Sequence, residues 1–143
     1  MKGRILELIS TLHLDWTRRI ARDLAPHAIT PKQIFLLRKL DEAGTLGPSE
    51  IAVLLHGDRP SATSMLGTLE RAGWVRRRRH PEDGKRVQVE LTGAGREKLA
   101  SVPLESWRSG HTRFDPLACL DPGEREQLAR LLEKLRRALE DEP

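Results

Sequence analysis

The residues of this sequence best suited to chemistry are positively charged and lie in one short segment. Residues 71–90 hold seven Lys or Arg and three Asp or Glu, a net charge of +4. The whole chain of 143 residues also carries +4, so the remaining residues sum to zero. Charge confined to one segment is the pattern expected of phosphate binding. A solvated edge strand protected by its charges is the alternative, but the run Arg76, Arg77, Arg78 and Arg79 exceeds what edge protection needs.

A helical pattern precedes this basic segment, and its polar face carries small hydroxyl groups. Apolar residues recur at the spacing of one buried face: Ala62, Met65, Leu66 and Leu69. The opposite face carries Ser61, Ser64, Thr68 and Arg71. Such hydroxyls stabilise a solvated helix little, because they compete for backbone hydrogen bonds. In a DNA major groove they allow a close approach to base edges and phosphates, so we expect this helix to read DNA.

Two short helices separated by a turn are the elements that would position the hydroxyl face. The first helix is predicted over residues 49–55, and His56 and Gly57 supply the turn. Asp58 can cap the second helix. Gly73 ends it, where a left-handed conformation is needed. The pattern is that of a helix–turn–helix.

A two-stranded hairpin would position the arginines. Strands are predicted over residues 74–79 and 86–91, joined by a turn over residues 81–84. In the second strand apolar and polar residues alternate, so one face is apolar and the other polar. A helix–turn–helix followed by such a wing predicts a winged helix–turn–helix over residues 29–99.

Helices with apolar stripes flank this region. The first stripe runs from Ile5 to Leu24, and we expect it to end there because Ala25 precedes Pro26 and is biased away from helical geometry. A capped helix with a stripe from Leu128 to Leu139 closes the chain. Both stripes need a distant partner, and pairing them across a two-fold axis gives a homodimer.

The remaining helices have recognisable ends. Residues 30–33 form a capping box with proline at the first helical position, and Gly44 ends that helix. Thr92 is predicted to cap a helix that continues towards Phe114, with a kink at Pro103. The predicted fold class is therefore mainly α, a winged helix–turn–helix with N- and C-terminal dimerisation helices. We expect a single unit over residues 1–143, in which residues 1–25 and 100–143 form the dimerisation region.

Composition narrows the class of protein further. No apolar run has the length of a membrane span, and Glu7 and His13 interrupt any signal-peptide core. We therefore expect a cytoplasmic protein with no membrane partner. No glycine-rich phosphate loop, nucleophile elbow or carboxylate pair is present, so we expect no enzyme and no cofactor.

Several segments resemble the MarR family of bacterial transcription regulators. They are I-T-P-K-Q-I at residues 29–34, P-S-E-I-A at 48–52, L-E-R-A-G-W-V at 69–75, P-E-D-G at 81–84 and L-T at 91–92. The resemblance implies a homodimer on a pseudo-palindromic operator, with recognition helices in major grooves and wings in flanking minor grooves. It also implies a regulator that usually represses and that a small organic or anionic ligand often releases from DNA.

The basic segment, the hydroxyl face and the resemblance together predict which residues contact double-stranded DNA. They are Arg59, Ser61, Thr63, Ser64, Thr68, Arg76, Arg77, Arg78, Arg79, Lys85 and Arg86. The family commonly carries arginine in the recognition helix where this chain has Ser64 and Thr68. Its wing has Asp-x-Arg, whereas here Asp83, which would orient the wing, precedes Lys85 and then Arg86. Whether Lys85 or Arg86 enters the minor groove stays open.

A ligand site would draw on the aromatic and imidazole side chains of the flanking helices, His13, Trp16, Trp107 and His111. Each is more often core or interface than pocket. Cys119 lacks a basic cluster, so we expect a small buried side chain, with a thiol sensor as the alternative. The five dispersed histidines lack zinc-ligand spacing, so no metal site is predicted, although folding can form one. A winged helix that binds protein is the competing class.

Overall fold

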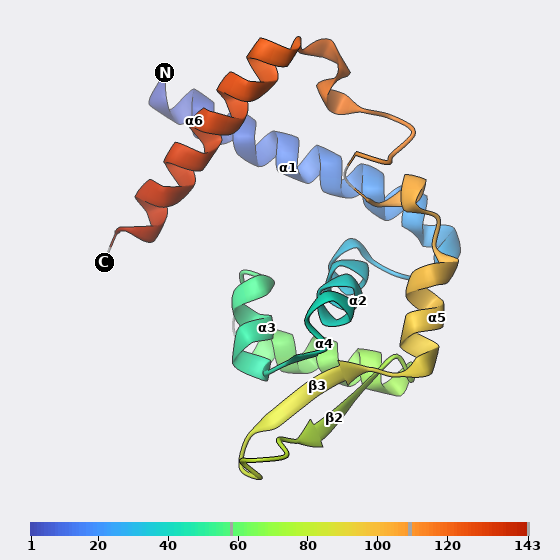
Figure 1. Ribbon diagram of the computed structural model, residues 1–143. Coiled ribbons are helices and arrows are strands. Elements are labelled where there is room, and N and C mark those ends of the chain that lie inside the picture. The colour runs from blue at the N-terminus through green and yellow to red at the C-terminus, as the bar shows by residue number, and fades with distance from the viewer. Residues whose placement is uncertain (58, 109, 143) are drawn as a thin grey trace. The chain divides into compact units, whose positions relative to one another are not determined.

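A computed structural model describes residues 1–57, 59–108 and 110–142 (Figure 1). The chain divides into two compact units, Met1–His111 and Thr112–Pro143. The helices of the first unit are α1 (Lys2–Leu24), α2 (Pro31–Ala43), α3 (Pro48–Leu54), α4 (Arg59–Arg71) and α5 (Gly93–Ser101), and its strands are β1 (Thr45–Leu46), β2 (Val75–Arg79) and β3 (Val87–Leu91). The second unit holds α6 (Pro122–Glu140). The predicted fold class, a mainly α winged helix–turn–helix, is confirmed.

Most helix ends follow the residues predicted to set them. The Thr30 hydroxyl accepts from the Gln33 N–H at 3.2 Å, and the side-chain oxygen Oε1 of Gln33 accepts from the Thr30 N–H at 3.0 Å. His56 has a positive φ of 51° in the predicted turn, and Gly73 follows α4 with φ 81°. The predicted cap at Asp58 lies outside the described residues.

Helix α1 ends at Leu24, as predicted, but Ala25 does not have the backbone conformation that its place before Pro26 favours. Ala25 is helical, with φ −52° and ψ −42°, although it precedes Pro26. A 3₁₀ turn over Ala25–His27 includes the proline, whose missing N–H is not needed in a first turn. Leu24 and Ile29 are buried on either side. We infer that this packing outweighs the bias of the residue before proline, which is a preference and not a prohibition.

The prediction that the helix after Thr92 continues towards Phe114 is wrong, because α5 ends at Ser101. Val102 precedes Pro103 and is extended, with φ −87° and ψ 121°. Its side chain is only 2% exposed, so the extended backbone turns Val102 into the core. A 3₁₀ turn over Leu104–Ser106 follows. Here the restriction on the residue before proline ends the helix without a kink.

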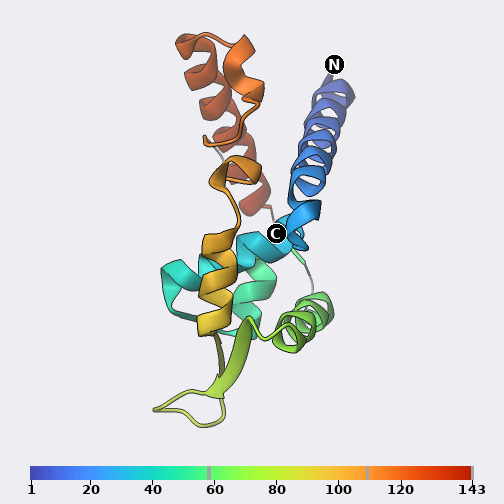
Figure 2. The ribbon, with the colours of Figure 1, turned by 90° about the vertical axis from the view of Figure 1, so that its right-hand side faces the viewer.

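The sheet has the strand order β1-β3-β2 and is antiparallel throughout. The β2–turn–β3 hairpin, residues 75–91, is the wing, and it extends away from the helices in Figures 1 and 2. Its strands begin one residue later than predicted, at Val75 and Val87. Strand β1 was not predicted, because two residues are too few to show alternation.

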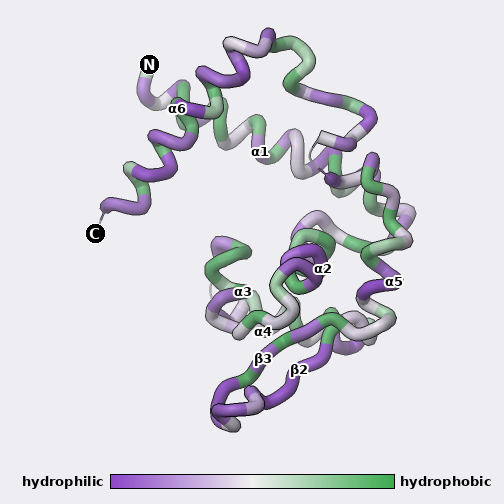
Figure 3. Tube along the Cα trace, in the orientation of Figure 1, coloured by the Kyte–Doolittle hydropathy of each residue, from purple (hydrophilic) through white to green (hydrophobic). Residues whose placement is uncertain are grey.

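The hydrophobic core lies between α2, α3, α4 and the sheet. Its fully buried large side chains are Leu24, Ile34, Leu36, Leu37, Leu40, Ile51, Leu66, Leu69, Val89 and Val102. Along β3, apolar side chains alternate with polar ones, whereas β2 is hydrophilic after its first residue (Figure 3). The inner face of the sheet therefore comes largely from β3.

The first turn of α5 packs tightly against the end of α4. The Thr92 hydroxyl donates to the Gly73 carbonyl oxygen at 2.5 Å and accepts from the Gly95 N–H at 3.0 Å. A Cβ atom added at Gly95 would lie 2.0 Å from the Trp74 carbonyl oxygen. The Lys98 ammonium donates to the His27 carbonyl oxygen and lies 5.2 Å from the centre of the Trp74 ring.

The apolar stripes of α1 and α6 are largely uncovered in the single chain. In the first unit, Ile5, Leu8 and Leu12 are exposed, while Ile20 and Leu24 near the end of α1 are buried. In the second unit, α6 has no buried residue, and its stripe of Leu128, Leu131, Leu132, Leu135 and Leu139 is exposed. Among the described residues, no helix has the length and apolar character needed to span a membrane.

Candidate nucleic-acid interface

A groove with a volume of about 470 Å³ runs between the start of α3, the start of α4 and the wing. We call it the wing groove, and its lining is Gly47, Pro48, Ser49, Glu50, Arg59, Thr63, Arg77, Lys85, Arg86 and Val87. Four of these side chains are cations and one is a carboxylate. The carboxylate of Glu50 accepts from the Gly47 N–H at 3.2 Å, so it already caps α3. The wing groove is therefore a concave, strongly basic surface.

The hydroxyl face of α4 is exposed, as predicted, for Ser61, Ser64 and Thr68. The Thr63 hydroxyl donates to the Arg59 carbonyl oxygen at 2.9 Å, and the Thr68 hydroxyl donates to the Ser64 carbonyl oxygen at 3.2 Å. A hydroxyl whose proton is used inside its own helix offers lone pairs to a partner. In this rotamer Thr63 and Thr68 can accept hydrogen bonds, for example from base amino groups.

The four consecutive arginines do not form one surface, because alternate residues of β2 point to opposite faces of the sheet. Arg76 and Arg78 share one face with Glu90 of β3. Arg77 lies on the other face, where it lines the wing groove and its Nε lies 2.5 Å from Oε1 of Glu70 on α4. The structure thus brings Arg77 to Arg59, Lys85 and Arg86, and it separates Arg76 and Arg78 from them.

Glu90 is a charged residue of the wing that the sequence analysis missed. Its Oε1 lies 2.6 Å from Arg76 Nε and 3.1 Å from Arg78 Nη1. The hydrogen bond from Arg76, and next the one from Arg78, lowers the pKa of the Glu90 carboxyl below its usual value. Arg76 stands directly opposite Glu90 in the strand register. Opposite charges at such cross-strand positions attract. The ion pair between Arg76 and Glu90 could therefore be predicted only from the register of β2 against β3.

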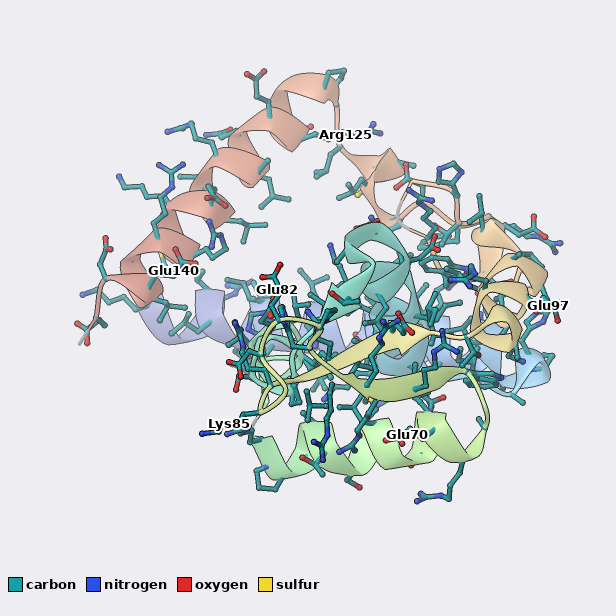
Figure 4. The ribbon with its side chains drawn as sticks, turned by 60° about the horizontal axis from the view of Figure 1, so that its bottom comes forward. Glu70, Glu82, Lys85, Glu97, Arg125 and Glu140 are labelled. Carbon is teal, nitrogen blue, oxygen red and sulfur yellow. The ribbon has the colours of Figure 1, made fainter. Side chains whose placement is uncertain are left out.

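The turn of the wing is organised by backbone hydrogen bonds to two side chains. Asp83 Oδ1 accepts from the Lys85 N–H at 3.2 Å, in keeping with the predicted orienting role. His80 Nδ1 accepts from the N–H groups of Glu82 and Asp83 at 3.1 and 3.2 Å, a role that the sequence analysis missed. Lys85 lies at the wing tip and projects away from the protein (Figure 4). Both Lys85 and Arg86 line the wing groove, so the choice between them stays open.

Two of the four residues predicted to bind a ligand come together. Trp16 and Trp107 line a pocket of about 220 Å³ with Thr17, Ile20, Pro31, Ile34, Phe35 and Arg38. The Trp107 Nε1 atom is buried and has no hydrogen-bond partner in the described part of the chain. His13 and His111 are exposed and do not line this pocket. The pocket therefore offers aromatic surface, and one of its lining residues, Trp107, carries a buried hydrogen-bond donor without a partner.

Cys119 departs from its expected burial. It is exposed, and its Sγ lies 3.4 Å from the Pro116 carbonyl oxygen at the end of a short 3₁₀ turn. The described part of the second unit contributes no residue to the buried core, so no buried environment is available there for the Cys119 thiol. Within the described ranges, no three His, Cys, Asp or Glu side chains are grouped so that they could hold a metal ion.

Comparison with known proteins places the chain among transcription regulators. The family model described as MarR family matches residues 29–87. The transcriptional repressor MprA of Escherichia coli K12 is 30% identical over 91 residues, which cover 64% of this chain and 52% of MprA. The chain thus spans about half the length of that relative.

Two further comparisons cover more of the chain. The HTH-type transcriptional regulator Mb0904 of Mycobacterium bovis is 31% identical over 122 residues, covering 84% of this chain and 80% of Mb0904. The crystal structure of a mutant E. coli MarR complexed with operator DNA superposes with a TM-score of 0.77 and 27% identity. It covers 92% of this chain and 93% of that one.

Proposed function

The chain belongs to the MarR family, and from this premise we propose that it is a homodimeric repressor that binds double-stranded DNA. The observation that carries the proposal is the wing groove, where Arg59, Arg77, Lys85 and Arg86 surround a hollow beside the exposed hydroxyl face of α4. The DNA backbone that separates a major from a minor groove would lie with its phosphates in the wing groove of the protein. Helix α4 would then enter the DNA major groove. The neighbouring structure of MarR with operator DNA supports this mode of binding.

The wing groove and the hydroxyl face of α4 should contribute differently to DNA binding, because their chemistry differs. Phosphate contacts supply affinity for any duplex, and contacts to base edges supply sequence choice. The cations of the wing groove would therefore set affinity, while Ser61, Thr63, Ser64 and Thr68 of α4 set the preferred operator. Lys85 or Arg86 would enter the flanking minor groove. With two protomers related by a two-fold axis, the half-sites should lie about 10 bp apart in a near-palindrome.

Replacing Arg77 with alanine is expected to weaken binding to all sequences alike. Each lost phosphate contact lowers the magnitude of the log–log salt slope by about 0.9, so two copies per dimer should flatten it by roughly 1.8. Ser64→Ala should leave the slope nearly unchanged and alter which operator is preferred, because a hydroxyl carries no charge. Binding of both variants to selected and random duplexes over a salt series measures the two effects.

Arg96→Ala is the matched control for this experiment, because it removes the same charge from α5, away from the wing groove. It should change the slope little. If Ser64→Ala altered the salt slope as much as Arg77→Ala does, the assignment of affinity to the wing groove and of sequence choice to α4 would be wrong. Absence of DNA binding by the unmodified protein over the whole salt series would favour the competing class, a winged helix that binds protein.

We further propose that a small aromatic ligand with a hydrogen-bond acceptor enters the pocket beside Trp16 and Trp107 and releases the protein from DNA. The unpartnered Trp107 Nε1 supports this, because a buried donor without a partner is destabilising and a ligand acceptor would satisfy it. Trp107→Phe keeps an aromatic ring and removes the donor. For a phenolic anion such as 4-hydroxybenzoate, we expect about fivefold to tenfold weaker binding by calorimetry.

His111→Ala serves as the control for the ligand site, because His111 does not line the pocket. Its affinity for the same anion should equal that of the unmodified protein. If His111→Ala lowers the affinity as much as Trp107→Phe does, the ligand lies elsewhere.

A further inference from the structure

The outer face of the wing holds a three-residue charge cluster of Glu90, Arg76 and Arg78. Glu90 projects from β3, the central strand of the sheet, and contacts Arg76 and Arg78 of β2 through the same oxygen, Oε1. Its side chain is 16% exposed, whereas those of Arg76 and Arg78 are 63% and 50% exposed. The carboxylate is thus partly shielded beneath two guanidinium groups, which would otherwise be free to bind phosphate.

The ion pairs sort the basic residues of the DNA-binding region into two groups. Arg76 and Arg78 are held on the outer face, and Arg77 is held by Glu70 in the wing groove. Within residues 1–57, 59–108 and 110–142, no carboxylate pairs with the side chains of Arg59, Arg79, Lys85 and Arg86. The unpaired charge therefore lies mostly in and beside the wing groove.

Glu70 and Glu90 have different consequences for their partners. Glu70 contacts Arg77 Nε, and the Nη atoms of an arginine held in this way can still reach a phosphate in the wing groove. Glu90 instead holds two arginines on the face of the sheet that the wing groove does not occupy. Glu70 therefore positions a phosphate-binding group, whereas Glu90 withholds two of them.

We propose that Glu90 limits the affinity of the protein for DNA of any sequence, by holding Arg76 and Arg78 away from phosphates. The proposal rests on DNA binding through the wing groove. Non-specific affinity comes almost wholly from phosphate contacts, so every freed arginine strengthens binding to any sequence. A regulator must find its site among very many competing sequences. Withholding two arginines lowers affinity for every duplex without touching base readout, so the protein leaves competing sequences sooner.

The test is to replace Glu90 with glutamine, which keeps the shape and removes the charge. We expect about fivefold tighter binding to random duplex, the upper range for releasing an exposed ion pair. If all four arginines of a dimer reach phosphates, the salt slope should steepen by up to about 3.6. A duplex selected from a random pool by the unmodified protein should gain affinity by a similar factor, because phosphate contacts do not depend on sequence.

Glu97→Gln is the matched control, because it makes the same change of charge on α5, far from Lys85 and Glu82 at the wing tip (Figure 4). It should alter both affinities only slightly. Equal effects of Glu90→Gln and Glu97→Gln would mean that net charge alone acts, and the proposal would be overturned.

A second pair of variants tests the arginines directly. Replacing Arg76 and Arg78 together with glutamine should barely change the slope when Glu90 is present, and it should abolish the gain produced by Glu90→Gln. If the double variant flattens the slope as much as Arg77→Ala, those arginines already bind phosphate and Glu90 does not withhold them. The double variant in the presence of Glu90 tests the proposal even if thermal unfolding shows Glu90→Gln to be misfolded. Failure of the unmodified protein to bind DNA would instead refute the proposed function.

Discussion

A variant with glutamate in place of both Leu131 and Leu135 is expected to lose dimerisation and, with it, at least about a hundredfold of operator affinity. These side chains are 44% and 43% exposed in the single chain, within a stripe that spans the length of α6. Apolar surface of this extent marks an interaction site. Two carboxylates placed in a dimer interface would be buried without partners, which strongly opposes association. A monomer binds one half-site only, so the linkage between half-sites is lost.

Sedimentation and gel-shift measurements on the same preparations test this expectation. Arg130→Gln with Arg137→Gln is the control, since it lowers the charge of α6 equally on the polar side of the helix. The control should stay dimeric and bind normally. An unmodified protein that sediments as a monomer at micromolar concentration would exclude the dimeric arrangement. The predicted division into a DNA-binding region (residues 29–99) and a dimerisation region (residues 1–25 and 100–143) depends on the same result.

Replacing Gly95 with alanine is expected to have the largest effect on folding, a loss of about 3 kcal/mol in the free energy of unfolding. The new Cβ would lie 2.0 Å from the Trp74 carbonyl oxygen and 3.1 Å from Leu91 Cδ2. Backbone atoms cannot move aside as a flexible side chain can. The Thr92 N–H also donates to the Trp74 carbonyl oxygen at 3.0 Å, so separating the two segments breaks that hydrogen bond.

Gly93→Ala is the matched control for this variant. Gly93 lies in the same helical turn, and a Cβ added there meets nothing within 4 Å. Alanine at this position should leave stability unchanged or raise it by up to about 1 kcal/mol, because glycine has more freedom to lose on folding. Urea unfolding followed by circular dichroism compares the two. Equal stability of the variants would show that α5 can shift away from Trp74 without loss.

Helix periodicity and capping residues were sufficient to predict the winged helix–turn–helix. They operate within a few residues, as the capping box at Thr30 and the buried face of α4 illustrate. The residue before proline shows the limit of local rules: Ala25 stays helical and Val102 does not. In each case tertiary burial, of Leu24 or of Val102 itself, favours the observed conformation. Sequence pattern alone contains no information on that packing.

The sequence indicated which residue types gather near the candidate site, but not how they are arranged in space. A run of four arginines reads as one basic surface, yet strand alternation places Arg76 and Arg78 opposite Arg77. Pairing with Glu90 depends on strand register, and pairing with Glu70 depends on how β2 packs on α4. The pocket shows the same limit, since Trp16 and Trp107 meet while His13 and His111 do not join them. Such contacts come from chain topology, which the spacing of residues does not specify.

The side chain of Lys98 joins two segments that are far apart in sequence. Its ammonium binds the carbonyl oxygen of His27, at the corner between α1 and α2, and rests over the ring of Trp74, just beyond the recognition helix. A shift of this corner would therefore disturb the side chain that packs on Trp74, three residues after the end of α4. Two sites that share one contact are energetically coupled, and such coupling is reciprocal. With the proposed DNA binding, a ligand that binds against α1 and shifts this corner is expected to change DNA affinity, and DNA should change the affinity for that ligand by the same factor.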